Sequence, residues 1–429
     1  VKLIKFTSPG FYNGQEIKDF SDSNSNSGIY THVDLDLDDN FGAKVALDRT
    51  GTRLAVLAPG YDGINNLYAD EGALYMVSLL SDGVTVSSFK KHSNSDWFTS
   101  LSRMNLKMAN FAINADWSRL LVAGSDGVIK GFSFGQLSSG EALSAPQGLF
   151  VAGNPSPLAR DDRFGSSVSL SADGKLMAVG ASYTASFTES GWTPPGAVRL
   201  FSFNGGSYAG GALVGTIGHG YAGSGNLHLA NLGAGDGFGS AVALNAAGNR
   251  LAVGAPADDG GFNDIFNSGA VYLFGFSGGS FTGASQLKLI GRNRTINPDT
   301  EAGDVFGSAV SLNASGDRLA VGAPGDDGFG NGYSSSGAVH LFVFSNDSYS
   351  TLTATGKVGR GYSGGVGFNV SSLEANDLFG SAVSLNGFGD RLAVGAPNDA
   401  GPSNIWSGAG AVHLFGFTNT SFSSPSRLG

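Results

Sequence analysis

Short runs in which large and small side chains alternate recur along the chain and predict β-strands. In the clearest unit, Phe306–Leu312 places Phe, Val and Leu on one parity and Gly, Ala and Ser on the other, which is the period of a strand. Asn313–Asp317 has the composition of a tight turn. Leu319–Ala323 then alternates in the same way and ends at Pro324, which cannot donate to a strand ladder.

The same unit continues with a polar loop of roughly a dozen residues, a length typical of binding loops. Gly337–Phe344 is predicted to be a third strand, and Tyr349–Val358 is predicted to be a fourth strand after a short hairpin turn. We therefore expect each unit to be a sheet of four antiparallel strands.

This unit is repeated over the whole chain. Near-identical copies begin at Phe238, Phe306 and Phe379, looser copies at Phe41 and Phe164, and an eroded copy at Phe98. A period of this size, made of short strands, is typical of a propeller. We predict an all-β fold, a β-propeller of four-stranded antiparallel blades with six repeats visible. Seven blades with one degenerate copy, and an open sandwich of many strands, are the alternatives.

The two ends of the sequence lead to further expectations. Val1–Phe6 resembles Leu287–Ile290, the predicted outer strand of another copy. We therefore expect the N-terminal strand to pair with the C-terminal strands and to close the ring. Residues 1–429 are expected to form a single propeller domain. The last residues, Arg427–Gly429, fall within a predicted strand, which suggests a piece of a larger protein.

Composition narrows the classes of function. Charged residues make up only 14% of the chain, and the net charge is −10, which argues against nucleic acid and anionic membranes as partners. The chain has no cysteine, so disulfides and thiolate chemistry are excluded. No apolar run approaches the length of a membrane span, and we expect no insertion into a membrane.

In such a blade, the loop after the second strand and the loop before the first strand lie on the same side. These are the long loops, and we call this side the long-loop face. An Asp stands two residues before each Phe that begins a copy; these are Asp39, Asp96, Asp162, Asp236, Asp304 and Asp377. Either this carboxylate accepts backbone N–H groups at the start of the strand, or it binds a cation.

Acidic residues also follow the Gly-Ala-Pro segment that ends the second strand. The ones that we consider as candidate Ca²⁺ ligands are Asp258, Asp259, Asp264, Asp326, Asp327 and Asp399. Oxygen-rich loops with glycine suit Ca²⁺, although the spacing matches no EF-hand. Solvated polar loops are the alternative, and we expect no cofactor to be required.

An aromatic residue precedes the Gly that opens the third strand in five copies. These candidate ligand-binding residues are Tyr68, Trp192, Phe266, Tyr333 and Trp406. They either anchor the loop to the neighbouring blade or provide a surface that stacks on a partner or a sugar.

The opposite face carries a basic residue before the second strand of each copy; these are Arg53, Arg119, Lys175, Arg250, Arg318 and Arg391. We interpret them as hydrogen-bond donors to loop carbonyls at the blade ends. No catalytic motif of the HExxH, GxSxG or phosphate-loop type is present. His340 and His413 occupy a repeat position that holds Tyr or Arg in other copies. We therefore predict that this strand position tolerates different residues and provides neither a metal ligand nor a catalytic base. We predict no enzyme activity.

The Phe-Gly start and the Gly-Ala-Pro end of each unit resemble the FG-GAP repeats of integrin α-subunit propellers. They are more similar still to FG-GAP repeats of large bacterial surface and secreted proteins. The resemblance implies a β-propeller with a role in adhesion or recognition. The integrin Ca²⁺ loop between the first two strands does not carry over, because its place here holds segments such as Ala314–Gly316.

These features favour a non-catalytic recognition or adhesion module of a bacterial cell-surface or secreted protein. We expect a protein or carbohydrate ligand on another cell or surface, bound through the long-loop face, and a monomeric isolated domain located outside the cell. A lectin with repeated sugar sites and a structural spacer in a surface fibre are the alternatives. An enzyme with a site on the ring axis would require unlike polar residues in one or two blades.

Overall fold

The structure is a computed structural model of the 429-residue chain. It describes residues 2–6, 14–19, 39–61, 72–79, 86–93, 110–114, 117–123, 128–133, 148–151, 163–183, 194–203, 208, 211–294, 296, 298–346, 348–363, 367–400, 408, 410–418, 422 and 425–427. Every secondary-structure element in these residues is a β-strand. The described part of the chain contains no helix long and apolar enough to cross a membrane.

The strands of the described residues form six sheets of four or five strands and one sheet of two strands. The first two large sheets are β3 (Lys44–Leu47), β4 (Arg53–Ala58), β5 (Ala73–Leu79) and β6 (Val86–Ser93), and β7 (Asn110–Ile113), β8 (Arg119–Ala123), β9 (Val128–Ser133) and β10 (Gly148–Val151). The third is β11 (Phe164–Leu170), β12 (Leu176–Ala181), β13 (Ala197–Ser202), β14 (Ala212–Gly218) and β15 (Leu227–His228).

The remaining large sheets have the same order of strands. The fourth is β16 (Ala241–Leu244), β17 (Arg250–Ala255), β18 (Ala270–Phe276) and β19 (Ala284–Gly291). The fifth is β20 (Ala309–Leu312), β21 (Arg318–Ala323), β22 (Ala338–Phe344), β23 (Leu352–Gly359) and β24 (Phe368–Asn369), and the sixth is β25 (Ala382–Leu385), β26 (Arg391–Ala396), β27 (Ala411–Gly416) and β28 (Ser426–Arg427). Consecutive strands pair antiparallel, except that the short β15 and β24 pair parallel with β14 and β23.

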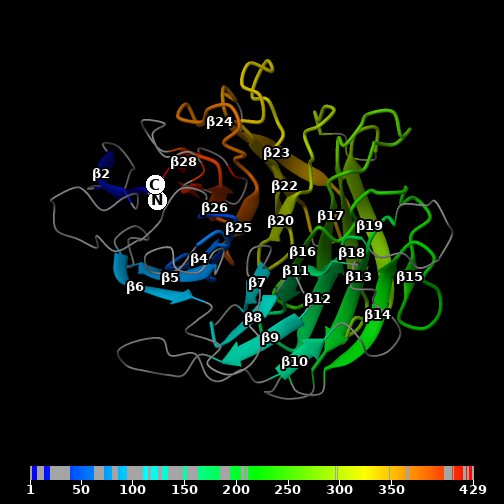
Figure 1. Cartoon of the computed structure of the whole chain (residues 1–429). Helices are drawn as coiled ribbons and strands as arrows, with labels where there is room; N and C mark the ends of the chain where they lie inside the picture. The colour runs from blue at the N-terminus through cyan, green and yellow to red at the C-terminus, as the bar shows by residue number, and fades with distance from the viewer. Residues whose placement is uncertain are drawn as a thin grey trace.

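The large sheets follow one another in chain order around an axis, from the blue sheet through cyan, green and yellow to orange (Figure 1). The first strand of each sheet is innermost, and it contacts the first strand of the next sheet. β25 and β26 of the sixth sheet contact β3 of the first sheet. The first and last of the large sheets, which are far apart in sequence, are therefore neighbours. The fold is therefore a β-propeller, as the repeats predict.

The glycines of the repeat lie where neighbouring sheets meet. A Cβ on Gly322 of β21 would overlap the backbone carbonyl oxygen of Gly380, the Phe-Gly glycine of the next sheet. Gly254 meets Gly307 in the same way. Glycine is required at such a contact because any side chain would push the two backbones apart. The repeated motif thus encodes the joint between sheets, which we call the glycine seam.

Three basic residues of the opposite face donate to turn carbonyls, two of them in the following sheet and one in its own sheet. Arg119 donates from Nη1 to the carbonyl oxygen of Gly174 at 3.1 Å, and Arg318 donates to that of Phe388 at 2.6 Å. Arg250 donates to the carbonyl oxygen of Asn249 at 2.7 Å. The interpretation of these residues as donors to loop carbonyls is confirmed for the three.

Two details differ from the sequence prediction. The N-terminal strand β1 (Lys2–Phe6) pairs with β2 (Gly14–Asp19), and the outermost strand of the sixth sheet is β28. The expectation that Val1–Phe6 completes the last blade is therefore wrong, because a nearby segment pairs with this strand instead. In the fifth copy, the innermost strand begins at Ala309 rather than Phe306, because Gly307 has a φ of 96° that an extended strand does not accommodate.

Candidate functional site

The long loops after β17 and β21 have closely similar sequences and lie in neighbouring sheets. Residues 256–269 connect β17 to β18, and residues 324–337 connect β21 to β22. Backbone N–H groups of the next sheet donate to the ends of these loops: Gly303 to Phe266, and Asn376 to Ser334, at 2.9 and 2.8 Å. Each loop is thereby fixed to its own sheet and to the following one.

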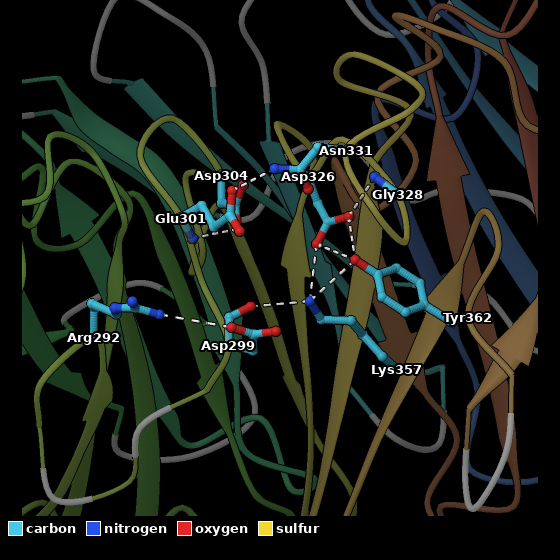
Figure 2. Close-up of polar contacts among 9 residues, drawn as sticks. All are labelled: Arg292, Asp299, Glu301, Asp304, Asp326, Gly328, Asn331, Lys357 and Tyr362. Carbon is cyan, nitrogen blue, oxygen red and sulfur yellow. Dashed lines mark hydrogen bonds and ion pairs between the residues drawn. The ribbon is translucent and has the colours of Figure 1, made fainter.

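A buried carboxylate, Asp326, holds the base of the second loop (Figure 2). Only 3% of this residue is exposed. Its Oδ1 accepts the backbone N–H of Gly328 at 2.9 Å, and the Tyr362 hydroxyl donates to it at 2.8 Å. Its Oδ2 lies 3.1 Å from Nζ of Lys357. These donors offset the cost of burying the charge.

Lys357 connects this carboxylate to the preceding loop. Besides Asp326, its Nζ donates to the carbonyl oxygen of Asp299 at 3.1 Å and contacts the Tyr362 hydroxyl at 3.2 Å. A second link lies above it in Figure 2, where Nδ2 of Asn331 donates to Oε2 of Glu301 at 2.6 Å. The loop before the first strand and the loop after the second strand therefore form one polar network.

The Asp that stands two residues before each Phe caps the backbone in the three sheets where its contacts are described. Asp236, Asp304 and Asp377 accept the backbone N–H of the residue three positions earlier, at 2.7, 2.8 and 2.7 Å. This confirms the backbone-acceptor interpretation for these three; Asp96 and Asp162 lie outside the described residues.

Burial changes the protonation of these capping carboxyls. It raises the pKa of Asp236, Asp304 and Asp377 to about 7 in each case. These pKa values already include a smaller upward shift from the negative charges of Asp258, Asp326 and Asp399, respectively, and a downward shift from the backbone hydrogen bond. Each of these sheets therefore holds two neighbouring acidic side chains, one before its first strand and one after its second strand.

In each of the three sheets, a different residue pairs with the carboxylate that follows the second strand, which is Asp258, Asp326 or Asp399. Asp258 is 1% exposed and binds Nη2 of Arg294 at 2.9 Å, and the Tyr272 hydroxyl donates to it at 3.2 Å. Asp399 instead faces Nε2 of His413 at 3.3 Å. Burial lowers the pKa of His413. The strand position predicted to be tolerant thus contacts buried Asp258 in the fourth sheet and half-buried Asp399 in the sixth.

The candidate Ca²⁺ ligands do not converge. Asp258 and Asp326 are bound to cations of the protein, while Asp259 and Asp327 accept the backbone N–H of Asn267 and Ser335 at 2.8 and 2.7 Å. Asp264 is exposed. Within the described ranges, no group of three or more His, Asp or Glu residues is placed to hold a metal ion.

Aromatic side chains of the two loops are directed to solvent. Phe266 is 70% exposed, and Tyr333 is 39% exposed, with the Arg360 guanidinium 4.2 Å from its ring centre. Sequence reasoning missed Phe262 and Phe329, which are 77% and 71% exposed. The signal for both was a Phe soon after the Asp-Asp-Gly of each loop. Three other predicted residues lie outside the described residues; these are Tyr68, Trp192 and Trp406.

Sequence reasoning also missed the cations beneath the loops. Arg294 follows β19, whereas Lys357 lies within β23, so the compensating charge comes from a different repeat position in each sheet. A search for a constant residue in every copy cannot find such a group. The one general indication of such a cation is that a buried carboxylate requires a hydrogen-bonded or charged partner.

Comparison with known proteins supports the repeat assignment. A family model described as the FG-GAP repeat matches residues 225–274 and 293–342. These two segments cover the first two strands, the long loop and most of the third strand of the fourth and fifth sheets. A search among curated proteins found no match.

Solved structures of propellers are similar at low identity. A candidate 6-phosphogluconolactonase from Bacteroides uniformis is 11% identical, with a TM-score of 0.47, over 90% of this chain and 83% of that chain. The propeller domain of Myceliophteria thermophila Cps50 (Swd1) is 11% identical, with a TM-score of 0.41, over 82% and 92%. Such similarities carry no argument about activity.

The repeated Phe-Gly and Gly-Ala-Pro segments form seams between neighbouring sheets, and the family model matches two of the copies that carry them. The chain is therefore a β-propeller that contains FG-GAP repeats.

Proposed function

We propose that this protein is a non-catalytic recognition module that binds a protein or glycan ligand through its long-loop face. The observation that carries the proposal is the exposure of aromatic rings on two neighbouring long loops that are fixed at their bases. Phe262, Phe266 and Phe329 are among the most exposed large hydrophobic side chains in the described residues. Aromatic side chains at such positions frequently anchor interfaces.

The network beneath the loops supports the same proposal. Buried Asp258 and Asp326, each bound to a cation of its own sheet, hold the loops in one conformation. A loop that is ordered before binding loses less conformational entropy when a ligand binds. Rigid exposed rings are therefore better suited to recognition than rings on an unsupported loop.

Adhesion of the purified protein to cells or glycan surfaces, measured for paired variants, tests the proposal. Phe266→Ala combined with Phe329→Ala should reduce binding at least tenfold, because each lost aromatic anchor costs about 1–2 kcal/mol. Phe388→Ala is the matched control, since Phe388 is 55% exposed in a turn between the first two strands of its sheet, on the opposite face. Unchanged adhesion of the double variant would contradict the proposal.

The proposal extends to the setting of the protein. The module acts outside the cell as part of a surface or secreted protein, without catalysis and without a required cofactor. If Ca²⁺ binds the acidic loops, it should raise the unfolding temperature of the protein. We expect a small effect, because Asp258 and Asp326 already form ion pairs with Arg294 and Lys357. A calcium titration of the unfolding temperature, with magnesium as the control, distinguishes the two cases.

We further propose that the ring holds six blades and is closed by a glycine seam between the sixth and first sheets. A Cβ on Gly395 of β26 would overlap the carbonyl oxygen of Gly42, as in the other seams. The N–H of Gly387 also donates to the carbonyl oxygen of Arg49 at 3.1 Å. Gly395→Ala should therefore destabilise the protein as much as Gly322→Ala; a neutral effect in denaturant unfolding would contradict closure.

A further inference from the structure

The exposed rings of the two neighbouring long loops stand at positions where the loop fold does not require them. The N–H groups of Gly261 and Phe329 each donate at 2.9 Å to the carbonyl oxygen of the residue that follows the fourth strand of its sheet. Phe266 and Ser334 each accept an N–H group from the following sheet. Phe329 therefore takes the place of a glycine in the other loop, and Phe266 takes the place of a serine. Rings that one copy replaces by Gly or Ser are not needed to fold the loop.

These rings lie on one continuous surface with several carboxylates. Phe266 accepts the N–H of Gly303 at 2.9 Å. Two residues before Gly303, the Glu301 carboxylate accepts Nδ2 of Asn331, which belongs to the loop of the fifth sheet (Figure 2). The segment after β23 joins the same loop through the N–H of Asn376. We call this area the two-loop surface; its described residues fall within 256–269, 292–305, 324–337 and 360–378.

Carboxylates outnumber cations on the two-loop surface. Apart from the buried and capping carboxyls, its acidic residues are Asp259, Asp264, Asp299, Glu301, Asp327 and Glu374. Its cations, apart from the Arg294 that binds Asp258, are Arg292 and Arg360. Arg292 lies 3.7 Å from Asp299, whose side chain is 90% exposed, so solvent weakens this pair. The two-loop surface is therefore negatively charged.

The turns of the opposite face have the reverse balance of charge. In the described turns between the first two strands and at the starts of the second strands, the cations are Arg49, Arg53, Arg119, Lys175, Arg250, Arg318 and Arg391, and the acidic residues are Asp48, Asp173, Asp317 and Asp390. The charge of the two-loop surface is thus not shared by the whole molecule. Such a surface attracts a positively charged partner and repels a second copy that presents the same surface.

An arginine of the protein itself shows how a cation occupies this surface. The Arg360 guanidinium lies 4.2 Å from the ring centre of Tyr333, and its Nη2 donates to the Tyr333 hydroxyl at 3.1 Å. In the described part of the chain, no cation lies over the rings of Phe266 and Phe329. A Lys or Arg side chain suits such rings, because its apolar stem covers a ring while its charge pairs with a carboxylate nearby.

We propose that the ligand of the two-loop surface is a protein segment rich in Lys and Arg. This inference rests on the proposed recognition function and narrows its ligand to a basic protein. Side chains of the segment stack on Phe266 and Phe329, and their charges pair with Asp264 and Glu301. A carbohydrate without amino groups carries no positive charge, so it would match the rings but not the carboxylates.

Fluorescence anisotropy with a labelled Arg-Gly repeat peptide tests the class of ligand, with Glu-Gly and Ser-Gly repeat peptides of equal length as comparisons. The wild type should bind the Arg-Gly peptide most tightly, and added salt should weaken this binding because it screens exposed charges. Phe266→Ala combined with Phe329→Ala should weaken binding about tenfold. Asp264→Asn combined with Glu301→Gln should weaken it about fivefold.

A matched pair of substitutions separates this site from a general attraction to an acidic chain. Asp173→Asn combined with Asp317→Asn removes the same charge from the opposite face and should bind the Arg-Gly peptide like the wild type. The inference is overturned if the wild type does not prefer this peptide, or if both pairs of acidic substitutions weaken binding equally. In that case, reduced adhesion of the Phe266→Ala, Phe329→Ala variant would still support the recognition surface, whereas unchanged adhesion would refute the proposed function as well.

Discussion

At the scale of single residues, the long-loop face depends on carboxylates that cannot remain buried without partners. Asp326 shows the principle, since backbone, hydroxyl and ammonium donors all converge on it. The cation was not predictable from the sequence, because Lys357 and Arg294 occupy different repeat positions. The capping role of Asp304 was predictable, because an Asp before a strand commonly accepts backbone N–H groups.

Replacement of Lys357 tests the energy of the buried pair. Lys357→Met leaves Asp326 charged and buried, so the free energy of unfolding should fall by about 3 kcal/mol. Lys175→Met is the matched control, because the Lys175–Asp173 pair spans 3.8 Å between exposed side chains and should contribute less than about 1 kcal/mol. Equal losses in urea unfolding would show that the buried pair stabilises nothing.

The capping carboxyls predict a pH dependence. The pKa of Asp304 is about 7 in the folded protein and near 4 when unfolded, so folding favours the protonated form. Its stabilising contribution is complete below about pH 4 and is lost as the pH rises to 7, with a slope of at most about 1.4 kcal/mol per pH unit.

Asp304→Asn isolates this contribution, because the amide oxygen can still accept the N–H of Glu301. Relative to the variant, the wild type should lose stability between pH 4 and pH 7 in denaturant unfolding at a series of pH values. A difference that does not vary over this interval would refute the raised pKa.

At the scale of strands and sheets, the repeat pattern predicted most of the architecture. The alternation of large and small residues located the strands, and the Gly-rich segments located the joints. The start of β20 at Ala309 rather than Phe306 was not predicted, because alternation continues through Gly307 while its positive φ turns the backbone. The pairing of β1 with β2 was missed because sequence similarity to an outer strand does not determine which strand is nearby.

The glycine seam makes a prediction about the repeat motif. Gly322→Ala should lower the free energy of unfolding by more than about 2 kcal/mol, because its Cβ would overlap the carbonyl oxygen of Gly380 and the backbone cannot move without separating the sheets. Gly332→Ala, in a loop position with open space around it, should be nearly neutral. Similar unfolding midpoints for both variants would mean that the seam is not tightly packed.

At the scale of the whole molecule, the residues that stabilise the propeller are separate from those of the proposed recognition surface. The constant residues form the seams and inner strands, whereas the residues that vary between copies stand on the long loops. The sequence marks Phe262 and Phe329 by their place soon after Asp-Asp-Gly, but the exposure of their rings depends on how each loop folds over its own sheet. This division is typical of a rigid scaffold that presents variable loops.

Hydroxyl-radical footprinting of the protein bound to its cell or glycan target tests the central claim most directly. The account predicts that binding protects Phe262, Phe266, Phe329 and Tyr333 from oxidation and leaves Phe388 as reactive as in the free protein. Protection of Phe388 with unchanged reactivity of the long-loop aromatics would place the ligand on the opposite face and contradict the account.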